Sequence, residues 1–405
     1  MSSTNVSLIL AESAQRYPDK AAVVLGPATV TYSQMWAQAR RFGAALQDAG
    51  VGFGDRVALM IPNVPQFPMA YYGALAIGAS VVPVHSLLVA DEIDYVLRDS
   101  GATVFICAGP LLGEGAKGAE LAGVPVWSVL HEGDEVPSLE RAAGAASPVD
   151  LVLRDPADEA VVLYTSGTTG APKGAVLSHD NVMWNATMSA FDTVRLQPDD
   201  VIFGALPLFH SFGQVVVLNA GFRAGATIAL VPRFDPAAAM DIIEATGVTV
   251  FAGVPTMYVA LLEFAQSDPR RPQFRLAVSG GASLPVAVID RFKDTFGADI
   301  YEGYGLSETS PVATFNQAWY GRKPGSVGRP IWGVEVAITS PELEGELKFL
   351  PSGDVGEIVI RGHNIFTGYL NKPDATDAVM VGAWFRSGDL GYADDQFGWI
   401  STGGG

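Results

Sequence analysis

The chain is organised around the stretch YTSGTTGAPKG, residues 164–174, which follows an apolar run at residues 160–163 that we expect to be a buried strand. Its glycines, Gly167, Gly170 and Gly174, can adopt positive φ angles and let a ligand approach the backbone closely. Its hydroxyl groups and the Lys173 ammonium can donate hydrogen bonds to phosphate oxygens. The hydroxyl side chains are those of Thr165, Ser166, Thr168 and Thr169. The stretch is therefore predicted to hold phosphate groups.

Two other interpretations of this stretch fit its residues less well. A Walker A loop requires a glycine followed directly by lysine and then serine or threonine, whereas here Pro172 precedes Lys173 and Gly174 follows it. A surface loop rich in glycine and threonine, without a ligand, has a similar composition. The position directly after a buried strand favours the phosphate loop over the surface loop.

Composition bounds the class of protein. The 405 residues are 49% hydrophobic and only 17% charged, which predicts a compact globular chain of two or three structural units. The formal net charge of −18 disfavours a nonspecific nucleic-acid binder, because that role needs a basic surface. Cys107 is the only cysteine, which excludes an internal disulfide and any multi-cysteine metal site. A reducing cytoplasm is therefore the predicted compartment.

The sequence contains no obvious targeting or membrane segment. No basic leader precedes the short apolar run near the N-terminus, so we predict no cleaved secretory signal. The longest apolar region, residues 71–84, is shorter than the roughly 18 to 20 residues needed to cross a bilayer. A transmembrane segment is therefore not expected.

The first part of the chain, residues 1–160, alternates short β-type runs with helical patterns. Ser33 and Gly50 are the predicted N-cap and C-terminal glycine of the first clear helix, residues 34–49. Strands that recur between helices predict βαβ units in a mostly parallel, doubly wound sheet. The other predicted elements are strands at 56–60, 80–84, 103–107 and 124–129, and helices at 66–77 and 91–98.

Residues 161–315 predict a second doubly wound sheet that carries the phosphate loop. Its strands are expected at 160–164, 201–206, 226–231, 248–252, 276–279 and 299–301, with helices such as 237–245 and 286–296. From residue 316 to about 400, β-runs at 335–338, 357–361 and 384–387 alternate with Gly/Pro-rich turns and predict a small β-barrel or distorted sheet. A Gly-rich end follows at 401–405. The predicted class is thus α/β, with two doubly wound sheets and a small β-barrel.

Further candidate site residues follow predicted strands. In LPLFHSFG, residues 206–213, His210 and Ser211 lie just past a strand, where ligands of open α/β sheets bind, although a lone histidine there can equally be structural. In SGGASLP, residues 279–285, two glycines connect a predicted strand to a predicted helix. This connection is either a ligand site or a simple strand-to-helix turn.

Two more stretches suit a nucleotide. In YEGYGLSET, residues 301–309, Tyr304 lies between glycines and can stack on an adenine. Ser307 can then bind the α-phosphate, and Glu308 can bind Mg²⁺ unless it is merely a solvated turn residue. In WFRSGDLG, residues 384–391, Asp389 can accept hydrogen bonds from two ribose hydroxyls, or else cap a turn.

Together with GEIVIRGHNIFTGYL, residues 356–370, these stretches resemble the adenylate-forming superfamily in order and approximate spacing, from the N-terminus to about residue 399. That superfamily contains acyl-CoA synthetases, aryl-CoA ligases, luciferases and the adenylation domains of peptide synthetases. The LPLFHSFG stretch looks most like a fatty acyl-CoA synthetase. Ser211 stands where amino-acid-activating domains usually carry aspartate, which argues against an α-amino acid substrate.

The resemblance implies specific roles. Lys173, His210 and Glu308 would be catalytic, with His210 contacting the substrate carboxylate and gating the path of the thiol, and Thr165 and Glu308 would hold the metal. ATP would be bound by Thr165, Ser166, Gly167, Thr168, Thr169, Lys173, Gly281, Ala282, Ser283, Glu302, Gly303, Tyr304, Gly305, Ser307 and Asp389. The acyl substrate would be bound by His210, Val254, Gly280, Gly281, Gly303, Leu306 and Val312.

The implied reaction has two steps. A carboxylate, expected to be that of a medium- to long-chain fatty acid, attacks the α-phosphorus of ATP and gives acyl-AMP and pyrophosphate. The thiol of CoA then displaces AMP. ATP and Mg²⁺ are the expected cofactors, CoA is the co-substrate, and the expected partners are a small-molecule carboxylate and a nucleotide, with a homodimer left open.

The sequence departs from the superfamily at its end. There the family continues into a hinge, a basic turn and a mobile domain that carries a catalytic lysine, whereas this sequence ends in Ser401, Thr402 and three glycines. We therefore expect a shortened large N-terminal domain, with the glycines resembling a cloning scar, that binds ATP and acyl ligand but is poorly active. Two alternatives are a fatty acyl-AMP ligase and a non-catalytic module that binds acyl-adenylate. Acyl-AMP ligases typically carry an insertion before the stretch at 356–370, and residues 341–351 are too short for it.

Overall fold

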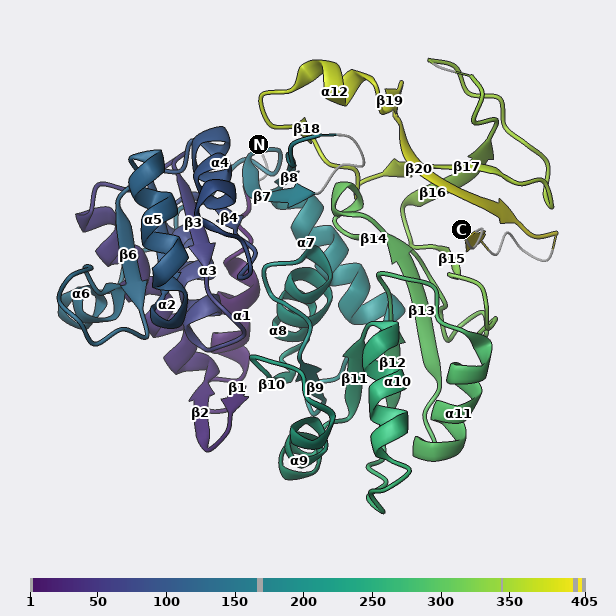
Figure 1. Ribbon diagram of the computed structural model, residues 1–405, viewed down its shortest axis with the longest axis horizontal. Coiled ribbons are helices and arrows are strands. Elements are labelled where there is room, and N and C mark those ends of the chain that lie inside the picture. The colour runs from purple at the N-terminus through teal and green to yellow at the C-terminus, as the bar shows by residue number, and fades with distance from the viewer. Residues whose placement is uncertain (1–2, 166–169, 344, 396–399, 403–405) are drawn as a thin grey trace.

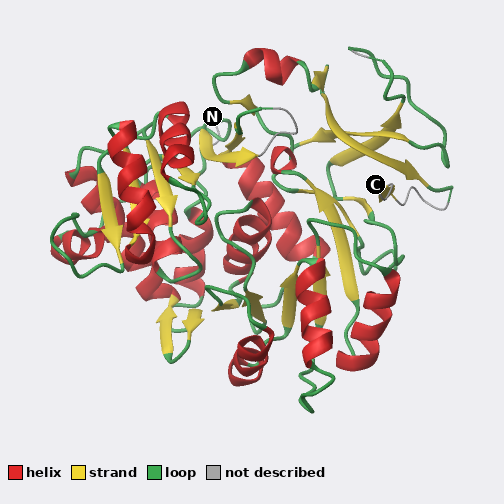
Figure 2. Ribbon diagram, in the orientation of Figure 1, coloured by secondary structure: helices red, strands yellow, loops and turns green. Residues whose placement is uncertain are grey.

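The computed structural model describes residues 3–165, 170–343, 345–395 and 400–402 (Figure 1). Within these ranges the strands form a seven-stranded sheet, a nine-stranded sheet and a five-stranded sheet. Helices lie between the strands of the two larger sheets, whereas the smallest sheet is almost free of them (Figure 2). The predicted α/β class, with two doubly wound sheets and a small curled β-unit, is confirmed.

The seven-stranded sheet has the strand order β18-β8-β7-β4-β3-β5-β6. The strands from β7 to β6 in this order are parallel, and β8 and β18 add antiparallel pairs at one edge. Its strands are β3 (Arg56–Met60), β4 (Ser80–Pro83), β5 (Val104–Ala108), β6 (Val126–Val129), β7 (Glu159–Thr165), β8 (Lys173–Ser178) and β18 (Gly368–Tyr369). Its helices are α2 (Tyr32–Asp48), α3 (Gln66–Ala76), α4 (Ala90–Ser100), α5 (Leu112–Ala122) and α6 (Leu139–Ala145). Every residue of β5 is buried, as expected for a parallel strand covered on both faces.

The nine-stranded sheet has the order β15-β14-β13-β12-β11-β9-β10-β1-β2. Its strands are β1 (Ala21–Leu25), β2 (Ala28–Thr31), β9 (Val201–Gly204), β10 (Thr227–Leu230), β11 (Val250–Gly253), β12 (Leu276–Ser279), β13 (Ile300–Gly305), β14 (Val312–Phe315) and β15 (Arg329–Pro330). The helices around it are α1 (Leu8–Arg16), α7 (His179–Met188), α8 (Ala220–Ala224), α9 (Pro236–Thr246), α10 (Pro255–Phe264) and α11 (Val286–Phe296), with short helical segments at Ser189–Thr193, Phe212–Asn219 and Ser307–Thr309.

The third sheet is antiparallel and curled, and it carries the C-terminal part of the chain (Figure 1). It contains β16 (Val334–Thr339), β17 (Gly356–Gly362), β20 (Trp384–Ala393), β19 (Met380–Val381) and β21 (Ile400–Thr402), and α12 (Pro373–Asp377) precedes β19. Among the described residues, no helix combines the length and the apolarity that a membrane span requires.

Strand pairing crosses the expected boundaries at residues 160 and 315. The hairpin of β7 and β8, which carries the ends of the predicted phosphate loop, extends the first sheet beside β4. The early hairpin of β1 and β2, which sequence reasoning missed, joins the second sheet beside β10. β15 also belongs to the second sheet. The expected membership of the strand at 160–164 in the second sheet is therefore wrong, because this strand pairs with β4 of the first sheet. The division into three subdomains stays a prediction.

The start of α2 corrects one expectation. The helix begins at Tyr32, and its N-cap is Thr31 and not Ser33. The Thr31 hydroxyl accepts a hydrogen bond from the Gln34 backbone N–H at 3.3 Å, and the Gln34 side chain accepts one from the Thr31 N–H at 2.9 Å. This reciprocal capping box satisfies two otherwise unpaired donors, which the predicted Ser33 cap would not have done. Gly50 follows the helix with a positive φ of 89°, as predicted.

Candidate active site

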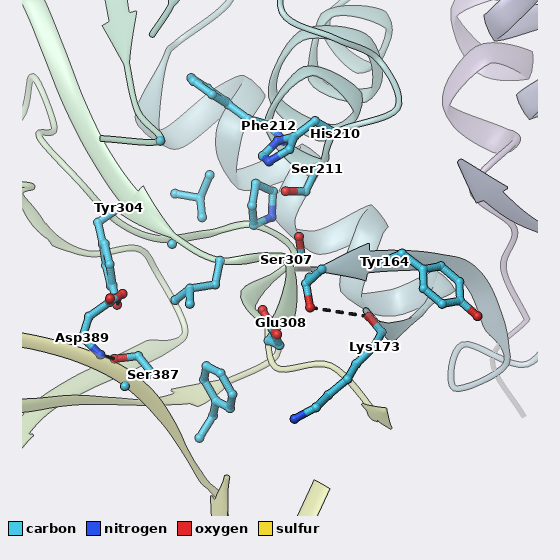
Figure 3. A pocket seen from close by; sticks show the side chains of 18 of the residues that line it. Tyr164, Lys173, His210, Ser211, Phe212, Tyr304, Ser307, Glu308, Ser387 and Asp389 are labelled. Atoms are coloured by element: carbon cyan, nitrogen blue, oxygen red, sulfur yellow. Dashed lines mark hydrogen bonds between the residues drawn. The ribbon is translucent and has the colours of Figure 1, made fainter. Parts of the chain in front are cut away.

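A cavity of about 1370 Å³ is lined by residues from all three sheets. Most of the predicted site residues that the structure describes line it. These are Thr165, Lys173, His210, Gly280, Gly281, Gly303, Tyr304, Gly305, Leu306, Ser307, Glu308, Val312 and Asp389. They converge because β7, β12 and β13 end at this cavity, while β20 of the third sheet lies across from them (Figure 3).

The remaining predicted residues lie elsewhere. Val254, Ala282, Ser283 and Glu302 do not line the cavity. The Glu302 carboxylate accepts a hydrogen bond from the Gly325 backbone N–H at 3.4 Å, and burial raises its pKa. Ser166, Gly167, Thr168 and Thr169 fall outside the described residues. Their roles stay predictions.

Lys173 begins β8 and pairs across the hairpin with Thr165 of β7. The Thr165 hydroxyl donates a hydrogen bond to the Lys173 carbonyl at 3.5 Å (Figure 3). The Lys173 ammonium lies 5.1 Å from the centroid of the Tyr369 ring. No carboxylate of the described residues forms an ion pair with it. The Lys173 charge is therefore available to an anionic ligand in the cavity.

Glu308 lies in the helical turn Ser307–Thr309 and is only 7% exposed. Its carboxylate accepts a hydrogen bond from the Tyr369 hydroxyl at 2.8 Å. Burial, followed by the nearby Glu308 charge, raises the pKa of Tyr369, which therefore stays protonated and donating. Tyr369 thus contacts both predicted phosphate-site groups, the Lys173 ammonium through its ring and Glu308 through its hydroxyl.

The predicted metal ligands are few. Among the described residues there is no cluster of three or more histidine, cysteine, aspartate or glutamate side chains that could hold a metal ion. Glu308 and Thr165 offer one carboxylate and one hydroxyl oxygen on the lining of the same cavity. This oxygen set suits Mg²⁺, which proteins usually bind through one or two carboxylates together with substrate phosphates.

Tyr304 and Asp389 lie at the opposite side of the cavity (Figure 3). The Tyr304 hydroxyl donates a hydrogen bond to the Asp389 carboxylate at 2.7 Å, and the Asp389 N–H donates to the Ser387 hydroxyl at 3.1 Å. Burial and the Asp389 charge raise the pKa of Tyr304, so its hydroxyl remains a donor. One Asp389 carboxylate oxygen is thus already engaged by protein.

The glycines beside Tyr304 serve packing as well as the expected ligand approach. A Cβ added to Gly303 would lie 2.7 Å from the Phe315 ring, and one added to Gly305 would lie 1.8 Å from the Pro311 carbonyl oxygen. Both separations are too short for a real side chain. The cavity floor therefore requires glycine at these positions even without a nucleotide.

His210 follows β9 and is exposed to the cavity, although protein atoms surround its ring. Its Nδ1 accepts a hydrogen bond from the Phe212 N–H at 3.3 Å, which leaves Nε2 as the donor in the neutral ring. Burial, followed by nearby His85, lowers the pKa of His210. The ring is therefore neutral at pH 7 and can offer one N–H to an acceptor in the cavity.

An apolar wall lies beside His210. It is formed by the side chains of Phe212, Val216, Val278, Val312 and Phe315. Gly280 lies under this wall, where an added Cβ would be 3.2 Å from the Phe212 ring. The cavity therefore combines a cationic and carboxylate-bearing side with a hydrocarbon-lined side.

Sequence reasoning missed several lining residues, among them His85, Tyr164, Tyr369 and Ser387. His85 directly follows the strand predicted at residues 80–84. Its position after a strand, like that of His210, could have identified it as a candidate site residue. Tyr369 lies in the stretch at residues 356–370 that resembles the superfamily. Only the pairing of β18 with β8 brings it beside Lys173, and residue spacing does not encode that pairing.

Comparison with known proteins agrees with this geometry. The family described as AMP-binding enzyme matches residues 10–370. A long-chain-fatty-acid–CoA ligase of Bacillus subtilis (strain 168) is 34% identical over 419 residues, covering 96% of this chain and 74% of that protein. A feruloyl-CoA synthase of Amycolatopsis sp. is 34% identical over 386 residues, covering 94% and 74% respectively.

A solved structure extends the match to three dimensions. The crystal structure of the anthranilate CoA ligase AuaEII in complex with anthranoyl-AMP is similar with a TM-score of 0.93 and 25% sequence identity, and the match covers 99% of this chain and 77% of that one. The matched family range includes Lys173, Tyr304 and Glu308. The chain therefore belongs to the AMP-binding enzyme family, together with acyl- and aryl-CoA ligases.

Proposed function

We propose that this protein activates a medium- to long-chain fatty acid with ATP, forming acyl-AMP, and that the acyl group then passes to CoA. The observation that supports this most strongly is the composition of the cavity described above. Lys173 and Glu308 lie on one side, Tyr304 and Asp389 face them, and an apolar wall runs beside His210. Phosphates, a nucleoside and a hydrocarbon chain would each find matching chemistry there.

In the first step a carboxylate oxygen of the acid bonds to the α-phosphorus of ATP, and the bond to the pyrophosphate leaving group breaks. Lys173, free of any carboxylate partner among the described residues, would bind the outer phosphate oxygens. When bound through Glu308 and Thr165, Mg²⁺ would neutralise phosphate charge. Catalysis would come mainly from positioning and from stabilisation of the developing charge.

His210 would orient the acid. Its neutral ring keeps Nδ1 occupied by the Phe212 N–H, so Nε2 is the remaining donor for the substrate carboxylate. In the second step the sulfur of CoA bonds to the acyl carbon while the bond to AMP breaks, and the thiol proton is released to solvent. The position of His210 near the cavity surface is compatible with a route for that thiol.

The substrate class rests on the wall of the cavity and on the relatives. The hydrocarbon side chains and the Bacillus subtilis relative, named as a long-chain-fatty-acid–CoA ligase, support a fatty acid. The feruloyl-CoA synthase relative has the same sequence identity to this chain, 34%. Two aromatic rings, those of Phe212 and Phe315, line the same wall. An aryl carboxylate is therefore the second candidate. Ser211, in place of an aspartate, disfavours an α-amino acid.

We further propose that residues 1–405, studied by themselves, bind ATP and the acyl ligand but form acyl-CoA poorly. In this superfamily a lysine of a following domain is expected to contact the reacting carboxylate, and Lys173 would serve the outer phosphates instead. Two variants of the proposal are a fatty acyl-AMP ligase, which would pass the acyl group to a carrier protein, and an acyl-adenylate-binding module without turnover.

ATP–pyrophosphate exchange tests the proposal, with a panel of fatty acids of increasing length, hydroxycinnamates and α-amino acids. The panel is run on residues 1–405 and on the product of the gene read beyond them. We expect exchange with fatty acids, stronger for the longer product, and its loss in Lys173→Ala. Exchange that is supported only by hydroxycinnamates would select the second candidate, and exchange with α-amino acids alone would refute the substrate class. Robust acyl-CoA synthesis by residues 1–405 would refute their proposed impairment.

A further inference from the structure

A polar network beside the cavity joins three segments that are distant in the sequence. At its centre is Asp99 of α4, whose side chain is 17% exposed. One Asp99 carboxylate oxygen accepts a hydrogen bond from the Tyr164 hydroxyl at 2.8 Å, and the other accepts one from the Lys372 ammonium at 3.2 Å. Asp99 does not line the cavity. We call Asp99, Tyr164, Lys372 and Tyr95 the Asp99 network.

Lys372 completes this network. Besides Asp99, its ammonium donates to the Tyr95 hydroxyl at 2.9 Å and to the Pro172 carbonyl oxygen at 3.5 Å. The Tyr95 hydroxyl in turn donates to the same Pro172 carbonyl at 2.7 Å. All three N–H groups of the ammonium therefore have an acceptor. Such a saturated, partly buried arrangement restricts its members to one geometry.

The network holds the two strand ends that carry the predicted phosphate contacts. Tyr164 directly precedes Thr165 at the end of β7, and Pro172 directly precedes Lys173 at the start of β8. On the other side, the Leu370 N–H donates to the Gly174 carbonyl at 2.8 Å. Among the described residues, the Lys173 ammonium contacts the Tyr369 ring and forms no ion pair. Its location therefore depends on how its backbone is held.

We propose that Asp99 is a positioning residue for Lys173, and hence for the outer phosphates of ATP. Its carboxylate holds Tyr164 before the loop and Lys372 behind Pro172, so that β7 and β8 present Lys173 to the cavity. Asp99 does not contact the nucleotide. The inference rests on the proposed function, because it assumes that the cavity binds ATP through Lys173.

ATP and AMP distinguish this role from a merely structural one. AMP lacks the outer phosphates, so its binding depends on the Tyr304 and Asp389 side of the cavity and not on Lys173. For Asp99→Asn we expect ATP affinity to fall about tenfold, equivalent to about 1.4 kcal/mol, with AMP affinity unchanged. In a Lys173→Ala background, Asp99→Asn should have no further effect on ATP affinity, because both changes remove the same contact.

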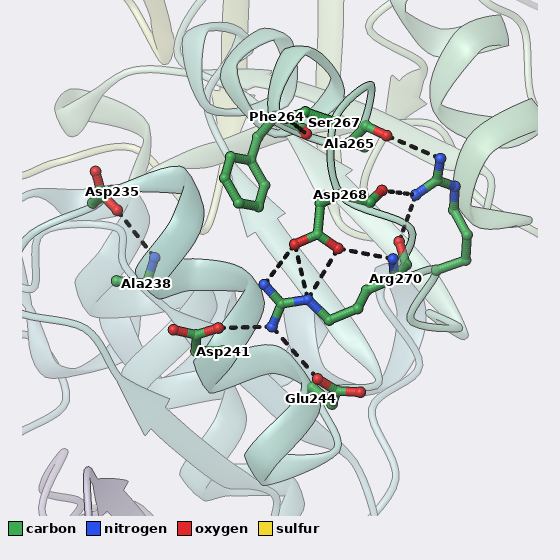
Figure 4. A network of polar contacts seen from close by, with 10 residues as sticks. Asp235, Ala238, Asp241, Glu244, Phe264, Ala265, Ser267, Asp268 and Arg270 are labelled. Carbon is green, nitrogen blue, oxygen red and sulfur yellow. Dashed lines mark hydrogen bonds and ion pairs between the residues drawn. The ribbon is translucent and has the colours of Figure 1, made fainter.

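The affinities are measured by isothermal titration calorimetry, with ATP and with AMP titrated into residues 1–405 and into each variant. Tyr164→Phe is the second variant, because it removes one hydrogen bond to Asp99 and keeps every charge. Asp268→Asn is the matched control. Asp268 is a carboxylate of similar exposure, 12%, that is bound by Arg270 (Figure 4) and does not line the cavity. The control should leave both affinities unchanged.

Three results would overturn the proposal. Unchanged ATP affinity in both Asp99→Asn and Tyr164→Phe would show that Lys173 is placed without the network. An equal loss of ATP and AMP affinity would reduce the role of Asp99 to general support of the fold. If the unmodified chain bound neither nucleotide, the proposed function would fail, and this inference with it. If the unmodified chain bound both nucleotides and the variants bound ATP equally well, the proposed function would stand and only this inference would be refuted.

Discussion

Two polar networks of this molecule look alike in composition and differ in what surrounds them. In the first, Lys372 joins Asp99, Tyr95 and the Pro172 carbonyl beside the cavity. In the second, Arg270 donates to Asp268 at 2.7 Å, to Asp241 of α9 at 2.7 Å and to Glu244 at 3.5 Å (Figure 4). Each places one cation among several oxygen atoms.

The difference lies in exposure and reach. Asp241 and Glu244 are 72% and 66% exposed, so water competes for their charges, and their contacts only join α9 to the loop after α10. Asp99 and Lys372 are 17% and 29% exposed and join segments that are 273 residues apart in the sequence. The contribution of an ion pair to stability therefore depends on its exposure to solvent and on which segments it connects. We expect the Asp99 network to support function and the Arg270 network to contribute little.

The largest expected effect on stability comes from Lys372→Met. Removal of the ammonium leaves the partly buried Asp99 charge without its cation and the Pro172 carbonyl with one donor fewer. We expect the free energy of unfolding to fall by about 2 kcal/mol, measured by urea denaturation followed by circular dichroism. If Lys372→Met lowered the free energy of unfolding no more than Asp241→Ala does, the distinction between the two networks would be wrong.

The two networks should also respond to opposite ends of the pH scale. Burial and the hydrogen bond to Asp99 raise the pKa of Tyr164, so the unfolded chain loses this proton near pH 10 while the folded chain keeps it. The unfolded state then binds fewer protons, and stability falls as pH rises above 10, by about 1 kcal/mol per pH unit. Hydrogen bonds from Arg270 lower the pKa of Asp268, so its contribution is lost as pH falls below about 4.

Urea denaturation of the single variants at a series of pH values separates these contributions. Tyr164→Phe should make the loss of stability above pH 10 less steep by the contribution of one proton and leave the acid side unchanged, while the other buried tyrosines keep theirs. Asp268→Asn should make only the loss of stability on the acid side less steep. If Tyr164→Phe left the alkaline slope as steep as before, the hydrogen bond between Tyr164 and Asp99 would not be important in solution.

Tyr369→Phe extends the comparison into the cavity. The variant keeps the ring under the Lys173 ammonium and removes the hydroxyl that holds the Glu308 carboxylate. We expect ATP affinity to fall about fivefold, corresponding to one hydrogen bond of about 1 kcal/mol, when Mg²⁺ is present. Titrations with and without Mg²⁺ provide the check, since an equal loss in both would mean that Glu308 does not serve the metal.

The smallest expected effect is that of Asp241→Ala in the Arg270 network. Arg270 keeps its contacts with Asp268, and the lost partner is largely solvated. The free energy of unfolding should change by no more than about 0.5 kcal/mol, and ATP affinity should not change. A larger loss in the same urea assay would show that solvent exposure is a poor guide to these networks.

Much of the fold could be predicted because its pattern is local. The helix predicted at residues 286–296 and the strands predicted at 56–60 and 276–279 have the observed bounds, since apolar periodicity and flanking turn residues mark them. The hairpin of β1 and β2 was missed, and the cap of α2 was placed at Ser33 instead of Thr31. Sheet membership was also beyond reach, because the pairing of β8 with β18 joins segments far apart in the sequence.

The candidate site shows the same limit. Sequence motifs could identify Lys173, Tyr304, Glu308 and Asp389. Each has a side chain that suits part of a nucleotide and follows a predicted strand or turn. Their shared cavity is consistent with those predictions, whereas their individual roles stay predictions. Residues that act through others gave no such signal. Asp99 lies in an ordinary helix, and only the folded chain brings it to Tyr164 and Lys372.

A crystal structure of residues 1–405 with ATP and Mg²⁺ tests the central claim most directly. We predict the outer phosphates beside the Lys173 ammonium, the metal ion on the Glu308 carboxylate and the ribose hydroxyls on Asp389, with the adenine against the Tyr304 ring. The present bond between Tyr304 and Asp389 would then share the carboxylate with the ribose. A nucleotide bound outside this cavity, or with its phosphates turned away from Lys173, would contradict the account.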